Sequence, residues 1–345
     1  MISVAPLHLP LRHAFRIAHG SSTERTNALV QVGEGLGEAA LPPYYPTTMA
    51  DVTAYVASIT PALENLLAQE TIPVHSFLSS LPSGPSPALA AIDMAVHDVH
   101  CKRLGIPLHT LIGLDPAAMP VSSYTLPIPQ DPESLDAMLD DVATFPFLKL
   151  KIGSGDLKWD EEIVRQTRSR FEGTLCVDVN AGWTVDETVG MLDRLSDLGL
   201  AFVEQPIPSG NMADWHRLRQ LAGQDTIPLI ADESVQKHAD VLALAGAADG
   251  INIKLAKCGG IQAARELIAI ARSLEMTVMV GCMIESSIAM TAAAHLGPLV
   301  DYLDLDGPMH LAADPYEGLD FDEGTITLPE RPGLGVRPAS GSSAA

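Results

Sequence analysis

The chain has few positive charges. Its 345 residues include 43 acidic side chains against 21 basic ones, so the formal net charge is −22. An acidic surface repels phosphate backbones and anionic lipid headgroups, and we therefore expect neither nucleic acid nor a membrane surface as a partner. Small molecules and metal ions remain as candidate partners. Lysine is especially scarce, and four of the seven lysines fall in two short segments, KLK at 149–151 and KLAK at 254–257.

Cysteine and long apolar runs are also scarce. The N-terminus has no basic start followed by an apolar run, and no segment reaches about 18 uninterrupted apolar residues. We therefore predict a cytoplasmic protein without a membrane span. The cysteines lie far apart and form no CxxC pair, so we expect free, mostly buried thiols rather than a zinc or redox site. They are Cys101, Cys176, Cys258 and Cys282.

Residues 1–118 predict a small α+β domain. Residues 28–32 alternate in polarity and lead into a glycine-punctuated hairpin, after which helical periodicity follows. Residues 86–104 carry an apolar helical face, with Asp93 and Asp98 elsewhere on the helix. We interpret this segment as a packed helix.

Residues 119–307 predict a parallel barrel. Short apolar strands alternate with amphipathic stretches, and polar residues at the strand ends recur every 22–29 residues. With 121–126 as the first strand we count eight strands, the number that closes a barrel. A doubly wound open sheet is the competing architecture, but no GxGxxG stands at a first βα turn. Residues 308–338 are expected to return to the first domain, and 339–345 to form a disordered tail.

Three carboxylates end neighbouring strands of the predicted barrel. Asp178, Glu204 and Asp232 end the third, fourth and fifth strands, whose carboxyl ends meet at one face. Three such groups would repel one another unless a cation lay between them. Oxygen ligands without His or Cys favour a hard ion, and we predict one Mg²⁺ per subunit. A single Asp of this kind would more often be a loop cap or an ion-pair partner.

Lysines stand on opposite sides of the same pocket. Lys149 and Lys151 lie two apart and both face into the barrel, while Lys254 ends a strand four positions away, half the ring. Lys151 and Lys254 can therefore serve as two bases on opposite faces of one carbon, removing and returning a proton through an enediolate held by the metal. We expect burial, mutual repulsion and the metal to lower the lysine pKa values. Alternatively, the lysines only neutralise the carboxylates.

The last strand ends with a second acidic pair. Asp304 and Asp306 lie two apart and face the same way, opposite the strand of Glu204. A substrate carboxylate at the metal would place an α-amino group, one peptide unit away, against this pair. The alternative is a solvated pair or a helix cap.

The motifs KLK, VDVN, VEQP, ADES and NIKLAKCGG occur in this order, and on them the chain resembles the enolase superfamily in its muconate-lactonising subgroup. The resemblance implies an α/β fold with a modified (β/α)₇β barrel and an α+β capping domain. It implies Asp178, Glu204 and Asp232 as Mg²⁺ ligands, and Lys151 and Lys254 as the acid/base pair. Lys149 would help to neutralise the enolate.

Two further segments resemble the dipeptide epimerases of this superfamily. YLDLDGP resembles their DxD, whose two Asp hold the dipeptide ammonium group, and GCMIESS implies that Met283 and Ile284 contact substrate. Ala-Glu epimerases carry an arginine in a capping-domain loop that pairs with the glutamate side chain. Around that place this chain has His19, with Arg16 and Arg25 nearby, as candidate substrate contacts.

The sequence thus predicts a Mg²⁺-dependent isomerase that epimerises the second residue of L-Ala-Xaa dipeptides, with L-Ala-D/L-Glu among the candidates. An N-acylamino acid racemase or an o-succinylbenzoate synthase would share the metal and the lysines but needs no ammonium partner. Muconate cycloisomerisation is disfavoured on the same ground. A catalytically silent scaffold that binds a metal or a peptide is the alternative from a different class.

Overall fold

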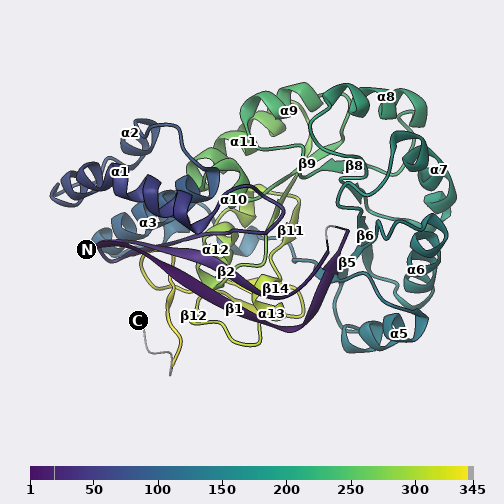
Figure 1. Ribbon diagram of the computed structural model, residues 1–345, viewed down its shortest axis with the longest axis horizontal. Coiled ribbons are helices and arrows are strands. Elements are labelled where there is room, and N and C mark those ends of the chain that lie inside the picture. The colour runs from purple at the N-terminus through teal and green to yellow at the C-terminus, as the bar shows by residue number, and fades with distance from the viewer. Residues whose placement is uncertain (19, 341–345) are drawn as a thin grey trace.

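The computed structural model describes residues 1–18 and 20–340. Figure 1 shows an N-terminal α+β unit beside a ring of strands surrounded by helices. The N-terminal unit packs three antiparallel strands against helices. Its elements are β1 (Ile2–Ile17), β2 (Gly20–Val32), β3 (Gly35–Ala39), α1 (Met49–Leu67), α2 (Val74–Ser79), α3 (Ser86–Leu104) and α4 (Leu108–Leu111).

The predicted hairpin is confirmed, and its glycines have a packing role. β2 and β3 pair from Val32 opposite Gly35 to Ala28 opposite Ala39. β3 lies so close to α3 that an added Cβ at Gly37 would stand 1.8 Å from the Ala91 carbonyl oxygen. The sequence did not reveal how long β1 and β2 are. They cross the molecule as the two long purple strands of Figure 1.

The middle of helix α3, residues 90–99, is buried on all sides, which corrects the one-faced helix expected from its periodicity. Asp93 and Asp98 are 2% and 0% exposed. Asp93 accepts a hydrogen bond from Ile261 N at 2.8 Å, at the start of α11 (Ile261–Ser273). Asp98 accepts bonds from Leu36 N and Leu334 N, at 2.9 and 2.8 Å. The two carboxylates are buried because they pair backbone groups of three other segments.

The eight barrel strands are all parallel and stand in the order β11-β10-β9-β8-β7-β6-β5-β4. A bridge between Ser122 and Leu303 brings the two edge strands together, so the expected barrel is confirmed. The first strand is shorter than the predicted 121–126, and Val121 is exposed. The remaining elements are β4 (Tyr124–Leu126), α5 (Pro132–Asp141), β5 (Phe147–Lys151), α6 (Leu157–Arg170), β6 (Thr174–Asp178), α7 (Val185–Leu195), β7 (Val203–Glu204), α8 (Met212–Ala222), β8 (Leu229–Ala231), α9 (His238–Leu244), β9 (Gly250–Ile253), α10 (Leu255–Cys258), β10 (Thr277–Gly281), α12 (Ser287–Ala294) and β11 (Tyr302–Asp304).

The segment after the barrel contacts the N-terminal unit. Leu311 forms a bridge with Leu11 of β1, and Gly333 forms backbone hydrogen bonds with Ile106, between α3 and α4, and with Leu108, the first residue of α4. Ala339 and Ser340 of the predicted tail make hydrogen bonds, and 341–345 lie outside the described residues. The elements are α13 (Gly307–His310), β12 (Tyr316–Glu317), β13 (Asp320–Asp322), β14 (Thr325–Thr327) and β15 (Arg337–Pro338).

Within residues 1–18 and 20–340, no helix has the length and apolar character that a membrane crossing requires. All four cysteines are free, with Cys101 and Cys176 buried and Cys258 and Cys282 partly buried.

Candidate active site

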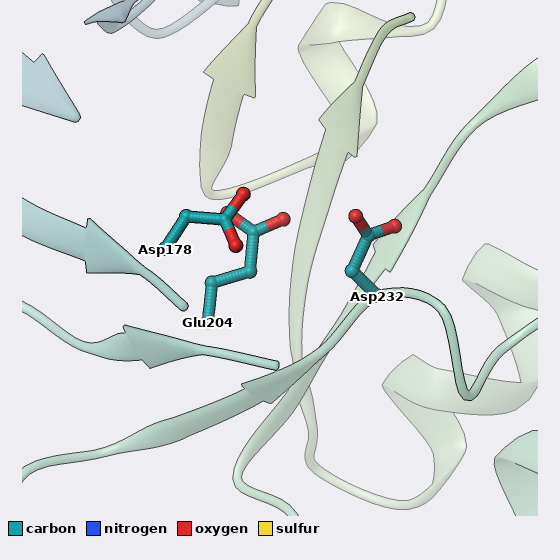
Figure 2. Close-up of side chains that lie close together, drawn as sticks. All are labelled: Asp178, Glu204 and Asp232. Atoms are coloured by element: carbon teal, nitrogen blue, oxygen red, sulfur yellow. The ribbon is translucent and has the colours of Figure 1, made fainter. Parts of the chain in front are cut away.

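Three carboxylates converge at the carboxyl ends of β6, β7 and β8. One oxygen of each of Asp178, Glu204 and Asp232 lies within 4.8 Å of the others, and all three residues are buried. Figure 2 shows them projecting toward a common point from consecutive strand ends. Parallel pairing sets this arrangement, because Asp178 and Glu204 stand side by side in the ladder and Asp232 directly follows β8.

The lysines of the two short segments hold these carboxylates. Lys151 Nζ lies 2.5 Å from Asp178 Oδ2, and Lys254 Nζ lies 2.7 Å from Asp232 Oδ2. Lys257, which lies one turn after Lys254, also donates to Asp232. β5, which carries Lys151, and β9, which Lys254 follows, are four positions apart in the sheet order. Lys151 and Lys254 therefore line one pocket from opposite sides of the ring.

The expected lowering of the lysine pKa values is wrong for this arrangement. Burial alone would lower the pKa of Lys151, but Asp178 opposes it and the pKa lies above its usual value. Burial likewise acts to lower the pKa of Lys254, yet Asp232 raises it well above the usual value. The sequence argument counted burial and repulsion between lysines. It did not include a carboxylate within hydrogen-bonding distance of each ammonium group.

The acidic cluster has the donor chemistry of a Mg²⁺ site. All three candidate ligands offer carboxylate oxygens, and none of them is His or Cys. Burial and the Asp178 carboxylate raise the pKa of Glu204 to about 8, as expected for a group held among like charges. Among the described residues, the side-chain oxygens of Asn180 and Asn252 nearby are buried without a hydrogen-bond partner. These oxygen donors fit a hard divalent cation.

The two carboxylates of the second acidic pair, Asp304 and Asp306, have different surroundings. Lys149 Nζ contacts Asp304 Oδ2 and lies 3.3 Å from Glu204 Oε2, so Lys149 bridges the pair and the metal cluster. Asp304 Oδ1 accepts further bonds from the Ser123 and Thr125 hydroxyls, at 2.8 and 3.1 Å. Asp306 faces the same pocket from just after β11. The part of the prediction in which Lys149 neutralises carboxylates thus matches the observed contacts.

Only some of the residues predicted to contact the substrate line the pocket. Met283, Ile284 and Arg25 line the pocket, and burial lowers the pKa of the half-buried Arg25 guanidinium. Arg16 is exposed on β1 and is not among the residues that line the pocket, which removes the basis for a substrate contact there. His19 lies outside the described residues.

Two family models cover most of the chain. Residues 1–113 match the mandelate racemase / muconate lactonizing enzyme N-terminal domain, and residues 133–341 match the enolase C-terminal domain-like family. The chain belongs to the mandelate racemase / muconate lactonizing enzyme family. The family's two-domain arrangement agrees with the α+β unit and the barrel described above.

Several relatives are similar over nearly the full length. The L-Ala-D/L-Glu epimerase of Bacteroides thetaiotaomicron is 35% identical over 96% of this chain and 86% of its own. The L-Lys-D/L-Arg epimerase of Methylococcus capsulatus is 37% identical over 97% of this chain and 98% of its own. The crystal structure of a dipeptide epimerase from Cytophaga hutchinsonii, complexed with Mg and D-Ala-L-Val, matches with a TM-score of 0.86 and 26% identity, covering 99% and 97% of the two chains.

Sequence reasoning missed several residues that line the pocket. Tyr44 and Tyr45 line it from the stretch between β3 and α1, and Asn180 and His310 line its wall. Asn180 donates to Asp178 at 3.3 Å and stands two residues beyond it, so the VDVN motif held a signal for it. No comparable signal pointed to Tyr44 and Tyr45, because the position of the stretch between β3 and α1 depends on how the two domains pack.

A buried pair of carboxyl groups lies where the N-terminal unit meets the barrel. Glu38 of β3 accepts hydrogen bonds from Asn27 and from Ser286 beside α12, and Glu285 Oε2 accepts one from Met283 N at 2.9 Å. Burial and the nearby Glu38 raise the pKa of Glu285 to about 8. The unfolded chain has a glutamate pKa near 4.3. The folded protein therefore binds more protons than the unfolded chain between about pH 4.3 and 8, and its stability falls as pH rises through this window.

We expect Glu285→Gln to remove this pH dependence. The free energy of unfolding of the variant, relative to the wild type, should increase by on the order of 2–4 kcal/mol between pH 5 and 8. Urea denaturation at several pH values measures the difference. Glu172→Gln, at an exposed site, is the matched control and should show a constant difference. Parallel curves for Glu285→Gln and the wild type would contradict the prediction.

Proposed function

We propose that this chain is a Mg²⁺-dependent epimerase of L-Ala-Xaa dipeptides that inverts the α-carbon of the second residue. The observation that carries the proposal is the pair of lysines, Lys151 and Lys254, which line one pocket from strands four positions apart beside a buried carboxylate triad. The epimerase names and the Mg and dipeptide complexes of the relatives support it.

The lysines divide the proton transfer between two faces of the α-carbon. One lysine accepts the α-proton in its neutral form, which a Mg²⁺ ion beside Asp178 and Asp232 would favour by offsetting their negative charge. The protonated lysine on the other side donates a proton, so the stereocentre inverts. Asp178 and Asp232, each beside one lysine, position the two amino groups. Mg²⁺, when held by the three carboxylates, supplies positive charge that stabilises negative charge on the substrate carboxylate.

One feature of the pocket favours a dipeptide over an N-acylamino acid, and another concerns the side chain of the second residue. Asp306 presents negative charge where an amino terminus would lie, which suits an ammonium group and not an acyl chain. Arg25 lines the pocket from β2, and its guanidinium would suit an acidic side chain on the second residue, as in L-Ala-D/L-Glu.

The four free thiols fit a reducing compartment, and we propose the cytoplasm as the site of the reaction.

A dipeptide library in D₂O tests the proposal. The protein is incubated with Mg²⁺ and L,L dipeptides, and mass spectrometry follows deuterium at the second α-carbon while chiral chromatography follows the epimer. Exchange with inversion in L-Ala dipeptides is the expected result. N-acetyl and N-succinyl amino acids are included in the same screen. Exchange in these compounds alone would favour an N-acylamino acid racemase, and binding without exchange anywhere would favour a silent scaffold.

A further inference from the structure

His310, at the end of α13, lines the pocket and has no part in the proton transfer. We propose that His310 is a positioning residue for the substrate ammonium group, which holds Asp306 so that one of its carboxylate oxygens stays open to the amino terminus of a dipeptide. This inference rests on the proposed function, because it deepens the account of the same pocket.

His310 is fixed on three sides. Its Nε2 lies 2.9 Å from Asp306 Oδ2, four residues earlier, and its side chain is 13% exposed. Its ring centroid lies 4.9 Å from that of Phe15 on β1 and 5.2 Å from that of Tyr124 on β4. Both contacts are tilted or edge-on, which are favourable geometries for aromatic rings. The ring therefore keeps one orientation against Asp306.

The carboxylate oxygens of the acidic pair differ in what they already bind. Both oxygens of Asp304 are engaged, Oδ1 by Ser123 and Thr125 and Oδ2 by Lys149. Asp306 Oδ2 accepts from Thr125 N at 2.5 Å and from His310. In the described part of the chain, no hydrogen bond reaches Asp306 Oδ1. That oxygen is consequently the one in this pair that no protein donor occupies, and it can accept from an ammonium group.

His310 determines which oxygen of Asp306 stays open to the ammonium group. With both donors on Oδ2, rotation of the carboxyl group would break two hydrogen bonds at once, so Oδ1 stays turned to the same place. A substrate ammonium group then meets an acceptor that is already oriented, and binding loses less side-chain entropy. Without the imidazole donor, one bond from Thr125 remains and the carboxylate gains rotational freedom. The consequence concerns substrate binding and not the transfer of the α-proton.

Two variants of His310 separate these roles. His310→Phe keeps an aromatic ring against Phe15 and Tyr124 but removes the donor, and His310→Gln keeps a side-chain N–H without the ring. We expect His310→Phe to raise KM for an L-Ala dipeptide about tenfold, with kcat within about twofold, because a hydrogen bond to a charged group contributes at this level. His310→Gln should restore KM to within about threefold of the wild type.

A probe without an amino terminus provides the matched control. The N-acetyl amino acid that corresponds to the second residue should inhibit the wild type and His310→Phe with the same inhibition constant. Unchanged KM in His310→Phe, or an equal rise in Phe and Gln variants that remain folded by circular dichroism, would overturn the inference. An equal loss of affinity for the dipeptide and the N-acetyl compound would also overturn it.

The test also distinguishes this inference from the proposed function. Calorimetric titration of the Mg²⁺-loaded protein with L-Ala-L-Glu and L-Ala-L-Leu measures binding without turnover. If the wild type exchanges no proton but its dipeptide affinity still falls in His310→Phe and returns in His310→Gln, the epimerase proposal fails and the positioning role stands. If turnover is normal and the dipeptide affinity is the same in the wild type and in the His310 variants, the positioning role alone fails.

Discussion

Replacement of Lys151 or Lys254 by alanine should abolish epimerisation, while each variant still exchanges the α-proton of one epimer with solvent. The two lysines line the pocket from strands on opposite sides of the ring, so each can reach only one face of the α-carbon. A variant with one lysine can remove the proton that faces it and return a deuteron to the same face. Inversion requires both groups and should fall by about 10²–10⁴-fold or more.

The measurement uses the pure L,L and L,D epimers of one dipeptide in D₂O. Proton NMR should show loss of the α-proton signal from one epimer with Lys151→Ala and from the other with Lys254→Ala. Lys158→Ala, at an exposed position of α6, serves as the control and should behave as the wild type. Alanine removes an ion-pair partner of Asp178 or Asp232, so each variant is first checked for a cooperative thermal transition. Exchange of both epimers by either variant would contradict the two-base arrangement.

The barrel and its main polar residues were predictable because their signal is local. Each strand carries its own apolar run, and the polar residue at its end falls at a spacing of one βα unit. Parallel strands then bring the ends of neighbouring units together, which placed Asp178, Glu204 and Asp232 at one site. The inward orientation of Lys149 and Lys151 follows from the two-residue period of a strand.

Contacts between distant segments could not be predicted in this way. The pairing of Lys149 with Asp304 joins residues 155 positions apart, and the sequence assigned Asp304 to the substrate without revealing this partner. Asp93 and Asp98 looked like polar positions of an ordinary helix, yet both are buried. Their partners come from segments whose approach depends on domain packing. The same applies to Arg16, which is exposed and does not line the pocket, although its neighbour Phe15 does.

The error in the lysine pKa values has a related origin. Composition and spacing identify which charges share a pocket, but the direction of a pKa shift depends on distances of a few ångströms. Burial acts to lower the pKa of Lys151, but the Asp178 carboxylate 2.5 Å away and Glu204 act against burial, and the pKa is raised. The lysines therefore compensate the carboxylates of the pocket, in addition to the acid and base roles that we propose for them.

Glu204→Gln should lose the metal response of the protein without losing its fold. Glu204 is fully buried, and burial and the Asp178 carboxylate raise its pKa to about 8, so its ionised form is costly in the absence of a cation. Glutamine keeps the volume and can still accept the hydrogen bond that Asn252 donates to Glu204 Oε1 at 2.6 Å. The metal-free variant should consequently be at least as stable as the metal-free wild type.

Glu204→Gln should, in contrast, reduce the stabilisation that Mg²⁺ gives to the folded protein. A ligand at 100 times its Kd stabilises the folded state by about 2.7 kcal/mol, which we expect for the wild type at saturating Mg²⁺. Loss of one ligand charge should weaken Mg²⁺ binding at least about 100-fold, so at the same Mg²⁺ concentration most of this stabilisation disappears together with turnover. Urea denaturation with Mg²⁺ and with EDTA measures both quantities, and Glu172→Gln controls for removal of an exposed carboxylate. A variant that kept the full Mg²⁺ effect would show that Glu204 is not a ligand. A large loss of stability in EDTA would instead make Glu204 a structural ion partner of Lys149, 3.3 Å away.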